Sequence, residues 1–269
     1  MLDTQTFVID LGIGLVAGVV GGLAGIGGSI VMLPGLALFH GYRTENDDEH
    51  HIYMAASMLV NIVVALSASL KHRQKKAVRP GIMAWLATSM SVGALSGVLA
   101  SGLVKGTVNK WVFASFIWAY CLYTIVTLVR RLPERPDDAP TPKPIVLAII
   151  GLFTGFAAGF LGVGGGILLV PLLQVAGMPL RQAIAGSAAV MWISAAVGAT
   201  SKLIKIHFNA DLEALGLTPM DAIAIAGPMG AGALAGGFLG AWLSHTLKIP
   251  ALKAVIVVVL SLAALKMVV

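Results

Sequence analysis

The sequence predicts an all-α, polytopic membrane protein built from two homologous repeats, each a glycine-broken helix hairpin followed by three transmembrane helices. Three observations predict this fold. Of the 269 residues, 58% are hydrophobic and only 11% are charged, whereas an average soluble domain carries about 25% charged residues. The apolar residues form runs long enough to cross a bilayer, which takes about 20 residues. The order of these runs, and a glycine-rich motif within them, occurs twice.

This composition excludes the soluble function classes. A soluble chain of this size could not cover its surface with so little charge, so soluble enzymes and nucleic-acid binders are excluded. The formal net charge of +6 does not indicate nucleic acid, because Lys and Arg lie between apolar runs, where they orient a membrane protein. We therefore expect a multi-pass protein of the cell membrane, in a bacterium the inner membrane.

Most apolar runs predict simple spans, and two predict broken helices. The simple spans are Ile52–Leu70, Pro80–Val104, Trp111–Val129, Ala183–Ser201, Pro219–Leu243 and Ala251–Val269. Phe7–Phe39 and Ile145–Met178 are longer, since either would rise about 50 Å as a straight helix against a hydrocarbon core of about 30 Å. Glycines interrupt both runs, so we expect each to form a hairpin.

The two halves of the chain also share sequence. The stretch GIGGSIVMLP at 25–34 matches GVGGGILLVP at 162–171, Pro80 corresponds to Pro219, and GALSG at 93–97 corresponds to GALAG at 232–236. Self-similarity of this kind indicates an internal duplication. We predict a first transmembrane repeat at residues 1–132, a proline-rich linker at 133–144 and a second transmembrane repeat at 145–269.

Charge predicts which loops are cytoplasmic, but it does not distinguish inverted from parallel repeats. The loop 71–79 is rich in Lys and Arg and should be cytoplasmic, together with the linker, whereas the acidic loop 40–51 should face outward. Inverted and parallel arrangements give the same Lys and Arg count on each side. The excess length of the broken elements favours hairpins that return to their own side, and therefore inverted repeats.

The glycine breaks are the candidate substrate site. Irregular backbone at membrane depth survives only where protein buries it or where it lines a polar cavity. A helix that restarts after a break presents amide groups and a positive dipole end, which favour an anion. Glycines spaced by four, such as Gly14, Gly18 and Gly22, are interpreted instead as helix-packing ridges, and the same ridges offer a contact surface for a homodimer. The predicted site residues in the breaks are Gly25, Gly27, Gly28, Ser29, Gly162, Gly164, Gly165 and Gly166.

Polar and aromatic residues inside the spans give further candidates. Asn61 either hydrogen-bonds another helix or contacts substrate, and Trp192, in the corresponding region of the second half, either packs or stacks on a ligand. We count both as candidate substrate-binding residues. Ser57 and Ser187 are expected to bond back to their own helices.

Several charged residues have structural and functional interpretations. Asp10 and Asp221 near span ends either reach the interface or couple transport to a proton or cation. Lys202 and Lys205 either snorkel to the surface or assist anion passage. The segment 45–51 carries carboxylates and two histidines, but adjacent side chains diverge, so a solvated loop is favoured over a metal site. No metal, cofactor or catalytic residue is predicted.

Nearly the whole chain resembles the sulfite exporter TauE/SafE family, also called the toluene-sulfonate uptake permease family. The resemblance is carried by the paired motifs, 25–29 with Pro34 and 162–166 with Pro171. It implies a membrane transporter of small sulfur-containing anions, such as sulfite, sulfonates and sulfoacetate. The second motif has Gly166 where the first has Ser29, which places a hydroxyl on one side only.

Three functional hypotheses follow. The favoured one is a secondary transporter that works by alternating access around the two breaks, because discontinuous helices at corresponding positions of two repeats mark transporter substrate sites. A membrane-embedded enzyme would need converging catalytic side chains, of which the spans contain almost none. A channel or structural subunit is the third hypothesis, although no ring of charged groups is evident.

Overall fold

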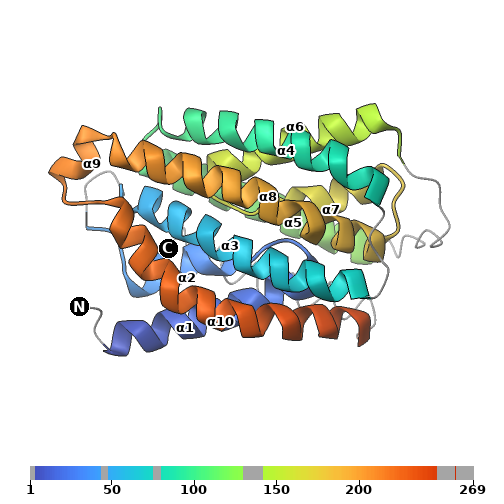
Figure 1. The fold of residues 1–269 in the computed structure, drawn as a ribbon, viewed down its shortest axis with the longest axis horizontal. Helices are drawn as coiled ribbons and strands as arrows, with labels where there is room; N and C mark the ends of the chain where they lie inside the picture. The colour runs from blue at the N-terminus through green and yellow to red at the C-terminus, as the bar shows by residue number, and fades with distance from the viewer. Residues whose placement is uncertain (1–3, 44–47, 75–79, 130–141, 247–257, 259–269) are drawn as a thin grey trace.

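The computed structural model describes residues 4–43, 48–74, 80–129, 142–246 and 258 (Figure 1). These residues form helices and no strand, which confirms the all-α prediction. The helices are α1 (Thr4–Ala24), α2 (Ser29–Phe39), α3 (Glu49–Gln74), α4 (Pro80–Ser101), α5 (Gly106–Val129), α6 (Pro144–Leu161), α7 (Gly166–Val175), α8 (Leu180–His207), α9 (Ala210–Ala214) and α10 (Pro219–Thr246). Six of the described helices are long and apolar enough to cross a membrane.

The predicted simple spans correspond to α3, α4, α5, α8 and α10. Prolines begin α4, α6 and α10, where the missing amide donor is not needed by the first helical turn. The sixth predicted span, Ala251–Val269, lies outside the described residues apart from Val258, as does most of the predicted linker. The short helix α9 was not predicted.

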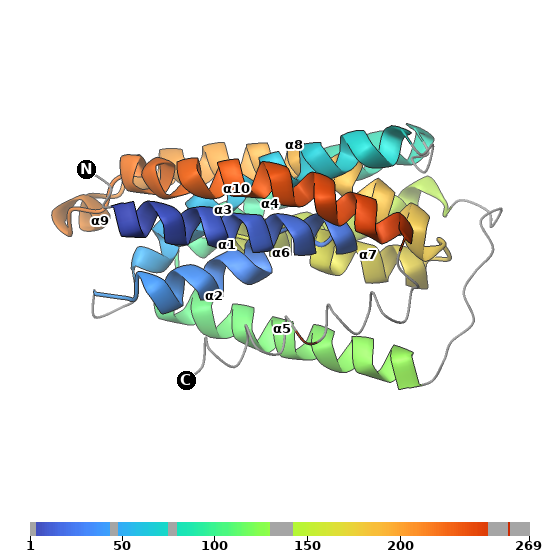
Figure 2. The same ribbon diagram turned by 90° about the horizontal axis from the view of Figure 1, so that it is seen from below.

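Both long glycine-interrupted runs form hairpins. In each, a long helix (α1 or α6) is followed by a short helix (α2 or α7) that runs back toward the end where the long helix began (Figures 1 and 2). The breaks fall at residues 25–28 and 162–165, between the helix pairs. The prediction that these runs return rather than cross is confirmed.

Helices α3 and α8 lie in the middle of the molecule, between the pair α1–α10 and the pair α4–α6 (Figure 1). Within each outer pair, the two helices pack closely at glycine residues. A methyl group on Gly18 would lie 2.8 Å from the Gly237 amide nitrogen of α10, and one on Gly155 would lie 2.7 Å from Met90 Cα of α4. Small residues let helix backbones approach this closely in membranes. The packing interpretation of the ridges is confirmed, and these ridges are used within the chain.

Helices at corresponding positions of the two halves run in opposite directions. In Figure 1, α1, α3 and α10 run one way, whereas α6, α8 and α4 run the other. The first helix of each half packs along the third long helix of the other half, α1 on α10 and α6 on α4. This arrangement agrees with inverted repeats, although the duplication itself stays a prediction.

The helix ends also agree with the predicted membrane orientation. The end of α3 and the start of α4, which flank the basic loop, lie at the same end of the molecule as the end of α5 and the start of α6 (Figure 1).

The acidic loop was predicted less well. Its last residues belong to α3 and are buried, with exposed fractions of 8% for Glu49, 0% for His50 and 7% for His51. A solvated loop through residue 51 is therefore wrong, because the first turn of α3 packs inside the molecule.

Candidate functional site

The first break joins α1 to α2 through backbone conformations that only glycine adopts easily. Gly25 and Gly27 have φ angles of +65° and +84°, a region that costs little without a Cβ atom. Helix α2 then begins with Gly28 as its N-cap and has no side-chain cap. Its first-turn amides consequently lack the usual capping partner from a Ser, Thr, Asp or Asn side chain.

The second break has the same outline with a different backbone path. Gly162 ends α6 at φ +72°, and Gly165 begins α7 at φ +77°. Positive φ thus occurs at Gly165 in the second break, whereas in the first break it occurs at Gly27, one position earlier in the aligned motif. Helix α7 also begins without a side-chain cap.

The two breaks are buried and face each other, as the sequence predicts. A methyl group on Gly27 would lie 3.5 Å from Gly164 Cα, and one on Gly166 would lie 2.7 Å from Ile26 Cα. The same methyl group on Gly166 would also overlap the Gly25 carbonyl. The structure therefore brings Gly25 and Gly27 of the first motif against Gly164 and Gly166 of the second.

Asn61, midway along α3, is hydrogen-bonded to the first break. It is fully buried, and its Oδ1 accepts a 2.8 Å hydrogen bond from the Gly28 amide. Its Nδ2 donates to Ser29 Oγ. A single amide side chain thus satisfies one backbone donor and one hydroxyl, both at the start of α2.

Met191 occupies the corresponding place on α8. Its Sδ would lie 3.3 Å from a methyl group on Gly27 and 2.7 Å from one on Gly164, so it touches both breaks. The sequence selected its neighbour, Trp192, which is half-buried and whose role stays a prediction. Met191 was missed because an apolar residue in an apolar span carries no signal in one sequence.

Each break is hydrogen-bonded to one serine on a helix of the other half. Ser57 Oγ on α3 donates to the Gly162 carbonyl at 2.7 Å, and Ser187 Oγ on α8 donates to the Gly25 carbonyl at 2.7 Å. Ser57 also lies 2.9 Å from the carbonyl of Met54 in its own helix. The expectation of local bonding alone is therefore wrong, since the broken backbone offers carbonyls that the serines reach across the two halves.

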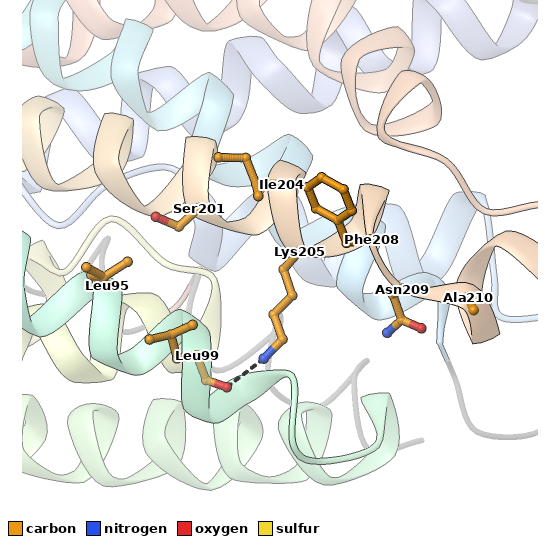
Figure 3. A pocket seen from close by; sticks show the side chains of 8 residues that line it. All are labelled: Leu95, Leu99, Ser201, Ile204, Lys205, Phe208, Asn209 and Ala210. Atoms are coloured by element: carbon orange, nitrogen blue, oxygen red, sulfur yellow. Dashed lines mark hydrogen bonds between the residues drawn. The ribbon is translucent and has the colours of Figure 1, made fainter.

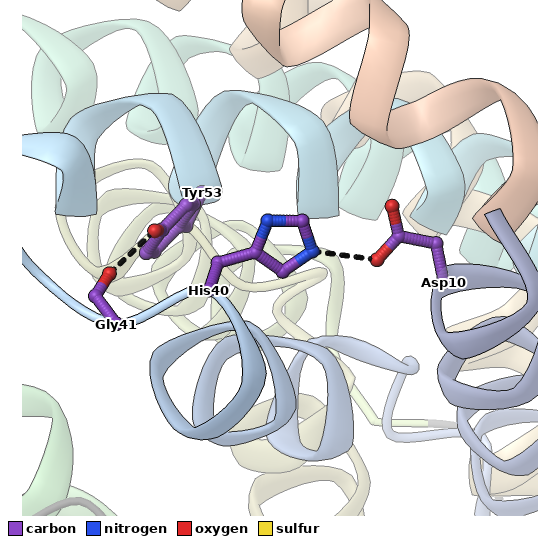
Figure 4. A network of polar contacts seen from close by, with 4 residues as sticks. All are labelled: Asp10, His40, Gly41 and Tyr53. Carbon is purple, nitrogen blue, oxygen red and sulfur yellow. Dashed lines mark hydrogen bonds and ion pairs between the residues drawn. The ribbon is translucent and has the colours of Figure 1, made fainter. Parts of the chain in front are cut away.

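A polar network lies where α1 begins and α2 ends, at the end of the molecule that the sequence predicts to face outward (Figure 4). This end is called the outer end below. Asp10 of α1 is fully buried, and its Oδ1 lies 2.8 Å from Nε2 of His40, which follows α2. Asp10 Oδ2 has no hydrogen-bond partner among the described residues. Tyr53 of α3 donates to the Gly41 carbonyl at 2.6 Å beside this pair. The interface interpretation of Asp10 is therefore wrong. Asp221, in contrast, is exposed and accepts from Thr218 at the start of α10.

Comparison with known proteins places this geometry in a family. The family model described as sulfite exporter TauE/SafE matches residues 11–267. The chain belongs to the sulfite exporter TauE/SafE family. It is consequently a membrane transporter protein, a multi-pass protein of the membrane, and the enzyme hypothesis is not favoured.

Similar proteins carry the same general description. The probable membrane transporter protein YunE of Bacillus subtilis is 28% identical to this TauE/SafE member over 96% of both chains. A probable membrane transporter of Methanocaldococcus jannaschii is 27% identical over 71% of this chain and 70% of its own. MamO of Magnetospirillum gryphiswaldense, also a probable membrane transporter, is 26% identical over 96% of this chain and 44% of its own. No solved structure matches significantly.

Proposed function

We propose that the chain is a secondary transporter of small sulfur-containing anions, such as sulfite, sulfonates or sulfoacetate, and that backbone amides at the two glycine breaks hold the anion. One observation carries the proposal. Two short helices, α2 and α7, begin at buried breaks that face each other, and the glycine at each N-cap offers no side-chain acceptor of its own. Helix N-termini of this kind favour a negative charge through their free amides and dipoles.

Asn61 acts in this proposal as a stand-in for the substrate. Its Oδ1 accepts from the Gly28 amide, which is the position that an anion oxygen takes when substrate is bound. The incoming anion replaces Asn61 at this amide, and the freed Nδ2 group becomes a further donor to the anion. The second break has Met191 at the corresponding place and offers amides only.

The transport step is alternating access around the breaks. In this structure the space between them is filled, since a methyl group on Gly27 would lie 3.1 Å from Asn61 Oδ1 and 3.3 Å from Met191 Sδ. Substrate therefore enters when two helix units, each made of helices from both halves, move apart at this point. The pairs α1–α10 and α4–α6 are tightly packed and are suited to move as rigid units. The sequence contains no nucleotide-binding motif, so an ion or anion gradient drives the movement.

The first test is sulfite uptake by the purified protein in liposomes. We expect saturable uptake that shows counterflow, which separates a carrier from a channel. Gly28→Val should reduce uptake by roughly 10- to 100-fold, because its side chain would lie 2.5 Å from Met32 Cε and 3.1 Å from the Ala17 carbonyl oxygen. Relieving these contacts shifts the Gly28 amide away from the anion and costs about 1.5–3 kcal/mol of charged hydrogen bonding.

Gly12→Val is the matched control, because Gly12 also lies in the first hairpin but has no atom within 4 Å of its side-chain position. It should transport at the wild-type rate. Wild-type uptake by folded Gly28→Val would contradict the site. Conversion of sulfite to another product in detergent would instead favour an enzyme.

We further propose that the Asp10–His40 pair carries the coupling proton or cation. The buried Asp10 carboxylate keeps one oxygen without a hydrogen-bond partner among the described residues, and such an oxygen accepts a proton or a cation. We expect Asp10→Asn to lose gradient-driven accumulation of sulfite while retaining sulfite exchange across the membrane. Asp221→Asn is the control and should accumulate sulfite normally. Full accumulation by Asp10→Asn would exclude this carboxylate as the coupling site.

A further inference from the structure

A lysine is buried at the outer end of the molecule, away from the breaks. Lys202 of α8 is 2% exposed, so neither snorkelling nor a surface role describes it. Its Nζ lies 2.9 Å from His51 Nδ1 of α3 and 3.0 Å from Ser101 Oγ of α4. Three helices from both halves thus converge on one ammonium group.

The partners of Lys202 are neutral or can be neutral. Ser101 donates its own proton to the Val98 carbonyl at 2.9 Å, so its oxygen accepts from Lys202. Among the described residues, no carboxylate lies within ion-pair distance of Lys202. A buried charge without a counter-charge is costly. An ammonium group has three donors, and the two contacts above use two of them.

An unused acceptor lies beside the same cluster. Asn109 of α5 is fully buried, and its Nδ2 donates to the Ser101 carbonyl at 3.2 Å. Its Oδ1 has no hydrogen-bond partner among the described residues. The cluster therefore retains one cationic donor and one neutral acceptor, both buried. A small oxyanion that carries a proton or a bound water satisfies both groups.

A cavity lies beside this cluster and shares His51 with it. A cavity of about 470 Å³ is lined by His51, by Gly102 to Lys105 and by residues of the α9 region. Asp48 and Asp211 also line it, against the single lysine Lys105, so the lining carries more negative than positive side chains. The positive charge lies behind His51, which contacts both the cavity and Lys202.

The next lysine along α8 has a different environment. Lys205 lines a second cavity of about 490 Å³, most of whose other walls are apolar. Figure 3 shows its Nζ donating to the Leu99 carbonyl at the end of α4, at 2.7 Å. The side chains of Leu99, Ile204 and Phe208 around it are more than half exposed, which is typical of a surface that faces lipid. Lys205 thus caps a helix end and provides a matched comparison.

We propose that Lys202, with His51, Ser101 and Asn109, forms a second anion-binding site that receives small oxyanions at the outer end of the transport path. At 1.5 Å per helical residue, this site lies about 15 Å from the glycine breaks along α3. The proposal rests on the proposed transport of anions. It adds a first binding step, in which Lys202 holds the anion before the helix units move apart at Asn61.

The test measures sulfite binding at constant ionic strength, by the thermal shift of tryptophan fluorescence and by calorimetry. The protein is purified full-length in detergent. In Asn61→Met, which removes the side-chain contact at the breaks, sulfite should still raise the melting temperature, because the Lys202 site is intact. Adding Lys202→Met should weaken this remaining binding at least about tenfold, because a charge-assisted hydrogen bond is lost. Adding Lys205→Met instead should leave it unchanged.

The outcomes separate the two proposals. If the wild-type protein binds no sulfite, both the proposed function and the second site are wrong. If Asn61→Met abolishes all binding, or if Lys202→Met and Lys205→Met have equal effects, the second site is wrong while the function stands. Lys202→Gln repeats the test with a polar side chain, so that a folding defect of Lys202→Met does not decide the result.

Discussion

Replacing Asn61 with methionine is expected to reduce sulfite uptake by roughly 10- to 100-fold while the protein still folds. Methionine is the informative choice because Met191 already occupies the corresponding place on α8, against the same two breaks. The variant has a larger, apolar side chain in the place of Asn61 and makes none of its hydrogen bonds to Gly28 and Ser29. Folding stability should fall by about 1–3 kcal/mol, since the buried Gly28 amide loses its acceptor.

The measurement is initial uptake into liposomes, with stability followed separately in detergent. Met191→Leu is the matched control, because it changes the other side chain between the breaks without removing a hydrogen bond, and it should keep most of the transport. If Asn61→Met and Met191→Leu lose transport equally, the breaks need only correct packing. Asn61 would then have no role in binding the anion.

The sequence predicts the breaks and the ridges because both depend on a local property of glycine. The positive φ angles of Gly25 and Gly162 follow from clusters that the chain carries twice, and the spacing of Gly14 and Gly18 indicates a face for close packing. Single-span lengths are likewise set by the bilayer. These features need no knowledge of which helices become neighbours.

The remaining site features depend on tertiary neighbours. Ser57 reaches the Gly162 carbonyl, and Ser187 reaches the Gly25 carbonyl, but a serine in a helix looks the same whether it bonds locally or across halves. Lys202 near a helix end resembles a snorkelling residue until α3 and α4 are placed over it. In each case the side chain's role is decided by pairing between the halves, which a single sequence does not specify.

The glycine ridges lead to the largest expected effect on folding. Gly18→Ala should destabilise the protein by about 1–3 kcal/mol, the range for overpacked cores, and Gly18→Leu should prevent folding. A methyl group on Gly18 would lie 2.5 Å from the Ala233 carbonyl oxygen, 2.8 Å from the Gly237 nitrogen and 2.9 Å from Ala233 Cα. All three atoms belong to the backbone of α10, which cannot rotate away as a side chain can. Helices α1 and α10 must therefore separate along their whole contact.

Gly12→Ala, on the same helix, is the control and should stabilise the protein by about 0.5–1 kcal/mol. Its side-chain position has no atom within 4 Å, and alanine is preferred to glycine inside a helix. The sequence has one cysteine, Cys121, which is buried, so thermal unfolding can be followed by its reaction with a fluorescent maleimide. This measurement uses no sulfite, which would itself consume the maleimide. Equal melting temperatures for Gly18→Ala and Gly12→Ala would mean that α1 and α10 do not rely on this close approach, and that they do not move as the rigid pair required for alternating access.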